Sequence, residues 1–355
     1  MTGLPEKATN YRRRWRIIRG YTVGWTAAFV FLSIVRGSGT VEEGSAQFAG
    51  PEATALAVLF GVLFGAIAGS WQVLIEERFY RRVPLRRLLL LRLLGAVLFL
   101  VALNIAGYTY VTTTRDISIG FVEFSFEPGS FAIYLYVLTV DTFLVALRQV
   151  NLLLGEGNLW RITRGAFYTP REIDLVVMFL DLRDSTALAE RLGHVQYSRL
   201  IQDCFYDLGV VTDHEARVYQ YLGDGAVLTW SSSDAIRNQN CIAAWFRFRG
   251  RLASRSAYYR DTYGCEPLFT AGAHVGIVTA TEVGRFKKEI AYHGDTLNTA
   301  ARIQAQCKPL GPELLISEAL VRLLPDGEPQ FARLGSFELR GKAGEVSVFS
   351  VVQPA

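Results

Sequence analysis

The chain has 355 residues, of which 50% are hydrophobic, with a net charge of +4 and a mean hydropathy of +0.22. This hydropathy argues against a purely soluble protein, and the length leaves room for two domains. The small positive charge lies beside apolar runs rather than in a basic patch, so nucleic acid is not an expected partner. The four cysteines form no CxxC pair, which argues against a disulfide framework or a cysteine zinc site.

Residues 1–154 are predicted to form a membrane domain of four transmembrane helices. A helix needs roughly 20 apolar residues to cross a bilayer, and four runs reach this length: 17–35, 53–75, 88–111 and 131–154. The first run has no small-residue cleavage site and three more runs follow it, so we interpret it as a span and not as a signal peptide.

The loops around these runs differ in charge. Basic residues gather before the first run and between the second and third, whereas the other two loops are mainly acidic. Because positive loops remain in the cytoplasm, we expect a multi-pass protein of the cell inner or plasma membrane, in contact with lipid. Both termini and the domain after the fourth run would then be cytoplasmic.

Two polar residues interrupt the apolar runs, Asn104 in the third and Asp141 near the middle of the fourth. An ionisable residue at this depth is a candidate functional residue. An interhelical hydrogen bond that holds the bundle together is the simpler interpretation, and we favour it. With so few polar residues, the four runs are typical of an anchor, a dimerisation unit or a receptor, and not of a transporter.

A linker interrupted by glycine and proline, 155–172, precedes a domain of mixed pattern, 173–355. The pattern predicts an α+β fold, with an antiparallel-rich sheet and flanking helices largely on one side. The expected elements are a strand 175–180, a helix 185–215, a hairpin 218–230, a helix 234–263, strands 268–280 and 289–292, a helix 296–306, a strand 313–316 and a closing strand pair 331–339 and 346–352.

Two aspartates follow predicted strands. Asp181 comes directly after the apolar run VVMFL, and Asp224 lies in the glycine turn of YQYLGDGAVLTW. If this hairpin lies beside the first strand, the two carboxylates converge at one end of the sheet, where they could hold two Mg²⁺ or Mn²⁺ ions. Taken singly, each aspartate is better explained as a turn residue or a helix cap.

A third polar group lies in YHGDTLNTAAR. Asn298 and Arg302 are four residues apart in a predicted helix, so both project from one face. An amide and a guanidinium together suit a triphosphate whose charge changes during reaction. A solvated polar face is the alternative, but it does not explain why three such groups occur in one domain.

These three segments resemble the class III nucleotidyl cyclase catalytic domain, of the bacterial membrane-anchored type, over residues 175–352. FLDLRDST is similar to the first metal loop of that family, YLGDGAVLTW to its metal hairpin and YHGDTLNTAARI to its signature helix. The resemblance implies Asp181 and Asp224 as metal ligands, and Asn298 and Arg302 as the pair that stabilises the transition state.

The C-terminal segment LRGKAGEVSVFSV resembles the closing strand pair of the same family. The resemblance implies that a basic residue there contacts the triphosphate, with Lys342 the better candidate and Arg340 the second. It also implies a head-to-tail homodimer, in which the aspartates come from one chain and Asn298 and Arg302 from the other. The expected reaction converts ATP to 3′,5′-cyclic AMP and pyrophosphate, and no named residue must act as a general base.

Two positions depart from the family pattern and leave the purine open. Many adenylyl cyclases of this class have Lys four residues before the second metal aspartate, and Asp, Thr or Ser three before the Gly-Asp of the signature helix. This chain has Gln220 and Ala291 there. We favour ATP, with a guanylyl or dual-specificity cyclase as the alternative. An inactive, receptor-like domain is disfavoured, because all four residues of the metal and transition-state pairs are present.

Overall fold

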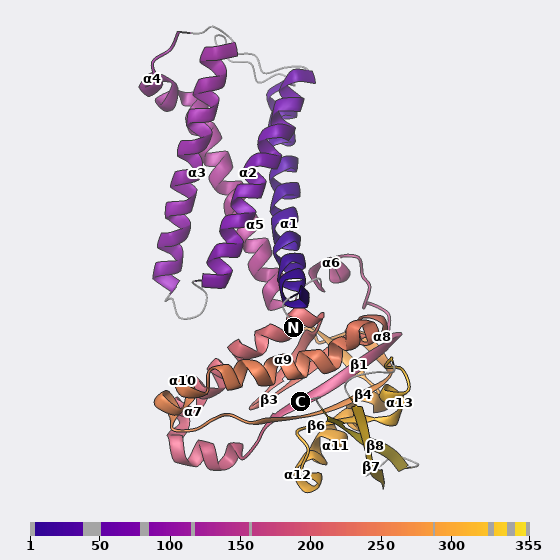
Figure 1. Ribbon diagram of the computed structural model, residues 1–355. Helices are drawn as coiled ribbons and strands as arrows, with labels where there is room; N and C mark the ends of the chain where they lie inside the picture. Colours follow the sequence, from indigo (N-terminus) through magenta and orange to yellow (C-terminus); the bar gives the residue numbers. More distant parts are fainter. Residues whose placement is uncertain are drawn as a thin grey trace. The chain divides into compact units, whose positions relative to one another are not determined.

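The computed structural model describes residues 4–37, 51–78, 85–114, 118–155, 158–286, 288–325, 330–338 and 345–352. The chain divides into two compact units, Met1–Val150 and Asn151–Ala355 (Figure 1). Because the two units differ in composition and architecture, each is described by itself.

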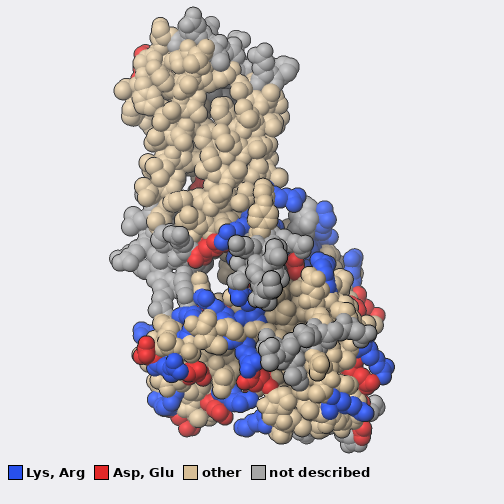
Figure 2. Space-filling model, in the orientation of Figure 1, with Lys and Arg blue, Asp and Glu red and all other residues tan. Residues whose placement is uncertain are grey.

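Four long helices form the first unit: α1 (Leu4–Gly37), α2 (Pro51–Arg78), α3 (Leu85–Thr114) and α5 (Pro128–Leu153). Each contains a stretch long and apolar enough to cross a membrane: Arg13–Val35, Ala53–Glu77, Leu94–Thr113 and Gly129–Leu153. The four predicted spans are thus confirmed as helices. A short additional helix, α4 (Phe121–Phe126), lies where only a loop was expected. The visible surface of this unit is almost free of charged side chains over most of its length (Figure 2).

A stripe of glycines on α2 allows α1 to pack against it closely. A Cβ atom on Gly61, Gly65 or Gly69 would lie 2.4, 2.5 or 2.7 Å from a Cα atom of α1. Small residues at every fourth position are a common way for membrane helices to approach each other. The centre of the unit is aromatic, with the rings of Trp25 and Phe64 each 4.9 Å from that of Phe99.

Polar contacts also link these helices. Asn104 on α3 donates a hydrogen bond to Tyr134 on α5 and accepts one from Ser125 at 3.0 Å, so it joins neighbouring segments as expected. The carboxylate of Glu76 on α2, only 5% exposed, accepts from Arg148 on α5 at 2.8 Å and from Arg13 on α1 at 3.1 Å. A carboxylate this buried is stable only with such partners.

The second unit contains one mixed sheet. Its strands are β1 (Arg171–Leu182), β2 (Arg217–Leu222), β3 (Gly225–Ser231), β4 (Phe269–Val283), β5 (Glu289–His293), β6 (Leu314–Ser317), β7 (Gln330–Glu338) and β8 (Glu345–Val352). They are ordered β2-β3-β1-β4-β6-β8-β7, and β5 pairs with β4. The pair β4–β6 is parallel and the other pairs are antiparallel. The expected antiparallel-rich sheet is confirmed.

Helices cover both faces of this sheet. Its helices are α6 (Asn158–Thr163), α7 (Ser185–Leu208), α8 (Ser232–Ile236), α9 (Asn240–Ser254), α10 (Ser256–Tyr263), α11 (Asp295–Ala305), α12 (Cys307–Leu310) and α13 (Glu318–Val321). Alternate residues of β1, such as Val176 and Met178, pack in one core with α7 to α10. Leu175 and Val177 point the other way and share a second core with Ala300 of α11. The prediction placed the helices largely on one face of the sheet, and it did not foresee that α11 covers the other face.

The helix predicted over 234–263 is divided into α8, a 3-10 turn (Arg237–Gln239), α9 and α10. Asn238 and Gln239 have positive φ values of 53° and 51°, which a continuous helix does not allow. Similarly, the helix predicted over 185–215 ends at Leu208 and continues as a 3-10 turn, Gly209–His214. In both cases the pattern of apolar residues continues through a change in backbone conformation.

The segment that precedes β1 packs onto the sheet. Phe167 is only 3% exposed, and its carbonyl oxygen accepts a hydrogen bond from the backbone N–H of Glu282 on β4 at 2.9 Å. The guanidinium carbon of Arg161 on α6 lies 4.7 Å from the centre of the Phe167 ring. The region expected as a linker, 155–172, therefore falls within the second compact unit.

Candidate active site

Asp181 and Asp224 are brought together by the pairing of β1 with the β2–β3 hairpin. Leu180 lies opposite Ala226, so the turn that carries Asp224 lies beside the end of β1. A Cβ atom on Gly225 would be 2.6 Å from the carbonyl oxygen of Leu180 and 3.5 Å from a carboxylate oxygen of Asp181. Glycine at this position allows the turn to approach the strand.

The two carboxylates influence each other. The pKa of Asp181 is raised, first by partial burial and second by the negative charge of Asp224, while a hydrogen bond from Gln304 on α11 lowers it. The amide nitrogen of Gln304 also donates to the hydroxyl of Thr270 at 2.9 Å, and Thr270 lies opposite Asp181 on β4. Gln304 thus fixes one side of the Asp181 carboxylate.

Tyr197 on α7 is a second neighbour of the pair. Its pKa is raised by burial and by the charges of Asp224 and Asp181, and its hydroxyl hydrogen-bonds with Asp224 and Ser185. Sequence reasoning did not identify Tyr197 or Gln304. Both lie on helices whose orientation only the fold determines, and neither is part of a quoted motif, although Gln304 directly follows YHGDTLNTAARI.

This donor set fits a hard divalent cation. Carboxylate oxygens are the ligands that Mg²⁺ and Mn²⁺ prefer, and a cation between the two aspartates would remove the repulsion that raises the pKa of Asp181. Among the described residues, no group of three or more His, Cys, Asp or Glu side chains is placed to hold a metal. The remaining ligands would therefore be water, main-chain carbonyls or phosphate oxygens of a substrate.

The helix α11 lies directly against β4. A Cβ atom on Gly272 would be 2.1 Å from the backbone nitrogen of Gln304, and one on Gly276 would be 2.7 Å from the hydroxyl of Thr296. That hydroxyl donates to the carbonyl oxygen of Ile277 at 2.7 Å. These contacts bury one face of α11 against the sheet, and the buried residues are Thr296, Thr299, Ala300 and Ile303.

Asn298 and Arg302 lie on the rest of α11. Asn298 is exposed and Arg302 is half-buried, and one terminal nitrogen of Arg302 is buried without a hydrogen-bond partner. Within the described part of the chain, no hydrogen bond or ion pair joins either residue to Asp181 or Asp224.

The remaining predicted positions are placed only in part. The exposed Gln220 lies on β2 and Ala291 on β5, and their neighbours Tyr219 and Tyr292 stack with ring centres 4.5 Å apart. The backbone N–H of Tyr292 also donates to the Tyr219 hydroxyl at 3.1 Å, so the strands that carry Gln220 and Ala291 are linked. Lys342 and Arg340 fall outside the described residues.

Comparisons with known proteins agree with this arrangement. A family model described as the adenylate and guanylate cyclase catalytic domain matches residues 167–353. Adenylate cyclase 2 of Rhizobium meliloti (strain 1021) is 30% identical over 226 residues, which cover 62% of this chain and 62% of that protein. Adenylate cyclase 1 of the same organism is 25% identical over 230 residues, 58% of this chain and 34% of that protein.

A solved structure of a bacterial light-regulated adenylyl cyclase is also similar. It matches with a TM-score of 0.54 at 17% sequence identity, and the match covers 64% of this chain and 67% of that one. At this identity the likeness shows a shared fold.

Proposed function

Because the chain belongs to the family of adenylate and guanylate cyclase catalytic domains, we propose that it is a membrane-anchored adenylyl cyclase that forms 3′,5′-cyclic AMP and pyrophosphate from ATP. The observation that carries this proposal is the convergence of Asp181 and Asp224 at one end of the sheet. The similarity to two adenylate cyclases supports ATP as the substrate.

Asp181 and Asp224 would hold two divalent cations, Mg²⁺ or Mn²⁺, which supply activation of the ribose 3′-hydroxyl and neutralisation of the triphosphate. Gln304 and Tyr197 orient the two carboxylates through the hydrogen bonds described above. Their contacts keep the carboxylates in place before substrate binds, which lowers the reorganisation needed during reaction.

Arg302 and Asn298 act on the reacting groups. The 3′-oxygen attacks the α-phosphorus in line and pyrophosphate leaves. The guanidinium of Arg302 stabilises the charge that develops on the α-phosphate. Asn298 orients the ribose. Lys342, or in its place Arg340, contacts the triphosphate, and Gln220 recognises the purine next to Ala291.

The active form is a head-to-tail homodimer. A second copy of the chain supplies Asn298 and Arg302, as the resemblance to the cyclase family implies. Two equivalent sites then form around a two-fold axis. The four helices anchor the protein in the membrane, where they raise the local concentration of the partner domain. Both termini and the catalytic unit lie in the cytoplasm.

Product formation by the purified full-length protein tests the activity, with ATP and GTP assayed in parallel in the presence of Mn²⁺. We expect cyclic AMP from ATP, and no product from the variant Asp181→Asn. Formation of cyclic GMP, alone or with cyclic AMP, would instead establish the guanylyl or dual-specificity alternative, which the departures at Gln220 and Ala291 leave open. Neither product, from a protein that is still dimeric, would contradict the proposed activity.

A mixture of two inactive variants tests the shared site. In a dimer of Asp181→Asn with Arg302→Ala, one of the two sites contains only unaltered residues. Random pairing of equal amounts should therefore restore about one quarter of the original activity. If Asp181 and Arg302 act in the same chain, every site in the mixture carries a substitution and no activity returns.

A further inference from the structure

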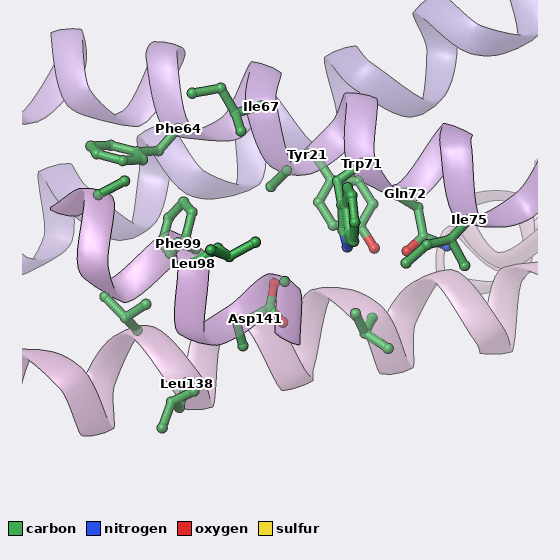
Figure 3. Close-up of a pocket in the computed structure, with 16 residues that line it drawn as sticks. Tyr21, Phe64, Ile67, Trp71, Gln72, Ile75, Leu98, Phe99, Leu138 and Asp141 are labelled. Atoms are coloured by element: carbon green, nitrogen blue, oxygen red, sulfur yellow. The ribbon is translucent and has the colours of Figure 1, made fainter. Parts of the chain in front are cut away.

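A cavity lies within the four-helix unit, among residues that the proposed reaction does not use. Its volume is about 220 Å³ and its walls come from α1, α2, α3 and α5. Most of the lining is apolar, with Phe64, Phe99 and Leu138 among the larger side chains (Figure 3). For comparison, an engineered apolar cavity of roughly 150 Å³ accepts benzene, so a molecule somewhat larger than one aromatic ring fits here.

Trp71 on α2 brings a hydrogen-bond donor to this cavity. Its side chain lines the wall, its indole nitrogen is buried, and no described residue accepts a hydrogen bond from that nitrogen. Figure 3 shows the ring reaching from α2 toward the helix that carries Asp141, with the nitrogen at the far end. Gly95 on α3 makes room for the ring, since a Cβ atom there would lie 2.5 Å from the indole nitrogen. A buried donor without an acceptor is unfavourable, so the cavity favours an occupant that supplies one.

The other polar side chains of the lining already interact within the protein. The amide of Gln72 donates to the carboxylate of Glu76 at 3.0 Å. Tyr21 and Asp141 each take part in an interaction with the described part of the chain. A ligand therefore needs no charge to match Asp141, and a charged group would be costly at this depth in the span Gly129–Leu153.

A second buried indole provides a useful contrast. Trp25 also has no acceptor for its indole nitrogen among the described residues. Its ring centre lies 5.8 Å from that of Phe29 and 4.9 Å from that of Phe99, so aromatic faces surround it and can accept its N–H weakly. Trp25 does not line the cavity. Of these two indoles, Trp71 is the one beside space that a ligand can fill.

We propose that this cavity binds a small neutral molecule with an apolar body and one acceptor oxygen, such as a ketone. The apolar walls take the body, and the oxygen accepts a hydrogen bond from the indole N–H of Trp71. A hydrocarbon of the same shape leaves this donor unsatisfied, and an ion would have to lose its hydration. Because side chains of four helices line the cavity, a bound molecule favours the packing in which they surround it.

Two probes of the same shape test the need for an acceptor. They are acetophenone and α-methylstyrene, which differ only in a C=O or a C=CH₂ group. Their binding to the full-length protein in phosphatidylcholine nanodiscs is measured by calorimetry. Because the probes also dissolve in lipid, each dissociation constant is referred to the probe concentration in the bilayer, measured with protein-free nanodiscs.

We expect the ketone to bind about three- to tenfold more tightly than the hydrocarbon, which is the range for one hydrogen bond. Equal affinities, or tighter binding of the hydrocarbon, would overturn the proposal. No nucleotide is present, so the result does not depend on the proposed cyclase activity.

Two variants locate the contact. Trp71→Phe removes the donor and keeps an aromatic wall, so the preference for the ketone should disappear. Trp15→Phe is the matched control, since Trp15 on α1 is 44% exposed and does not line the cavity, and it should retain the preference. The thermal midpoint of each variant without probe shows whether it is folded. A preference that survives in folded Trp71→Phe would show that the ketone is bound elsewhere.

A second measurement needs no variant to fold. The protein has six tryptophans, and ¹⁵N labelling of their indoles allows each N–H signal to be followed by NMR in the unaltered protein. Acetophenone should move one of these signals downfield, because its N–H gains an acceptor, and α-methylstyrene should not. The signal that moves should be the one missing from Trp71→Phe. If no indole proton moves downfield when the ketone is bound, the proposal is wrong.

Discussion

Asp181 occupies a position where a negative charge is unfavourable, because burial and the nearby charge of Asp224 both raise its pKa. The folded protein therefore holds the proton of this carboxyl more tightly than the unfolded chain does. Without a cation, this contribution to stability is present at low pH and is lost as the pH rises through the raised pKa. A bound cation reverses the effect by favouring the ionised pair.

The variant Asp181→Asn should therefore separate stability from metal binding. At neutral pH, in the presence of a chelator, we expect its thermal midpoint to be higher than that of the unaltered protein. Added Mn²⁺ should raise the midpoint of the unaltered protein and leave that of the variant unchanged. Asp174→Asn, at an exposed position on the same strand, is the control and should change neither value. A variant that still responds fully to Mn²⁺ would contradict the metal assignment.

Arg302 offers a second test at this scale. One of its terminal nitrogens is buried without a partner, so Arg302→Ala removes an unsatisfied group and should leave the thermal midpoint unchanged or slightly higher. Loss of a donor to the transition state should lower kcat by about 10²- to 10³-fold. Arg322→Ala removes an exposed ion pair with Glu318 and should not affect kcat. A large fall in midpoint with unchanged kcat would show that Arg302 is structural.

Much of the aspartate pair was predictable from the sequence, because an apolar strand and a Gly-Asp-Gly hairpin both place a carboxylate at the same edge of a sheet. Tyr197 and Gln304 were not predictable in this way. Each lies on a helix, and the rotation and tilt of that helix decide whether the side chain reaches the aspartates. Rotation and tilt depend on tertiary packing, which a local sequence pattern does not predict. The buried nitrogen of Arg302 depends on tertiary packing for the same reason.

At the scale of elements, glycines set the distance between packed segments in both units. Gly61, Gly65 and Gly69 admit α1 onto α2, and Gly272 and Gly276 admit α11 onto β4. At four of these glycines an added side chain would meet main-chain atoms, and at Gly276 it would meet the hydroxyl of Thr296. Main-chain atoms cannot move aside by a change of side-chain rotamer, so the packed segments would have to separate. The position of α11, and with it that of Asn298 and Arg302, depends on Gly272.

Gly272→Ala should therefore destabilise the second unit. Its Cβ atom would lie 2.1 Å from the backbone nitrogen of Gln304, and overpacking of this kind costs about 1–3 kcal/mol in the free energy of unfolding. Gly250→Ala on α9 is the matched control, since nothing lies within 4 Å of its added Cβ, and alanine favours a helix. Thermal unfolding of both variants provides the measurement. Equal midpoints would show that α11 can move away from β4 without cost.

The helices and strands themselves follow closely from apolar periodicity, and the four spans are the clearest example. The interruptions within predicted helices do not follow from this periodicity. The non-glycine residues Asn238 and Gln239 adopt positive φ in a segment that has helical periodicity, because packing of α8 and α9 on the sheet outweighs local preference. The second helix layer, formed by α11, was also missed, since an amphipathic helix does not indicate which face of a sheet it covers.

At the scale of the whole molecule, the second unit includes a packed segment ahead of its first strand. Phe167 lies ahead of β1, yet it is 3% exposed and bonded through its carbonyl to β4. Arg161 lies over its ring, and its pKa is lowered by burial and by the charge of Arg217 on β2. The segment that includes α6 and Phe167 is thus packed on β4, ahead of β1.

Removal of this ring should weaken the catalytic unit. Phe167→Ala is expected to lower the free energy of unfolding by about 3–5 kcal/mol, the usual range for a buried phenylalanine. Tyr168→Ala, at a neighbouring residue that is 84% exposed, should change it by less than about 0.5 kcal/mol. The midpoints of the two full-length variants can be compared directly. A similar loss in both would indicate a general effect of the linker and not packing of Phe167.

The packing of Phe167 also determines where this protein can be divided and recombined. A chimaera that joins the catalytic unit to a foreign sensor at the start of β1 would lack the buried ring of Phe167 and the guanidinium of Arg161 above it. A junction ahead of Asn158, the first residue of α6, keeps Arg161 and Phe167 together with the sheet. The exchangeable module is therefore longer than the cyclase-like region 175–352, because it includes α6 and Phe167.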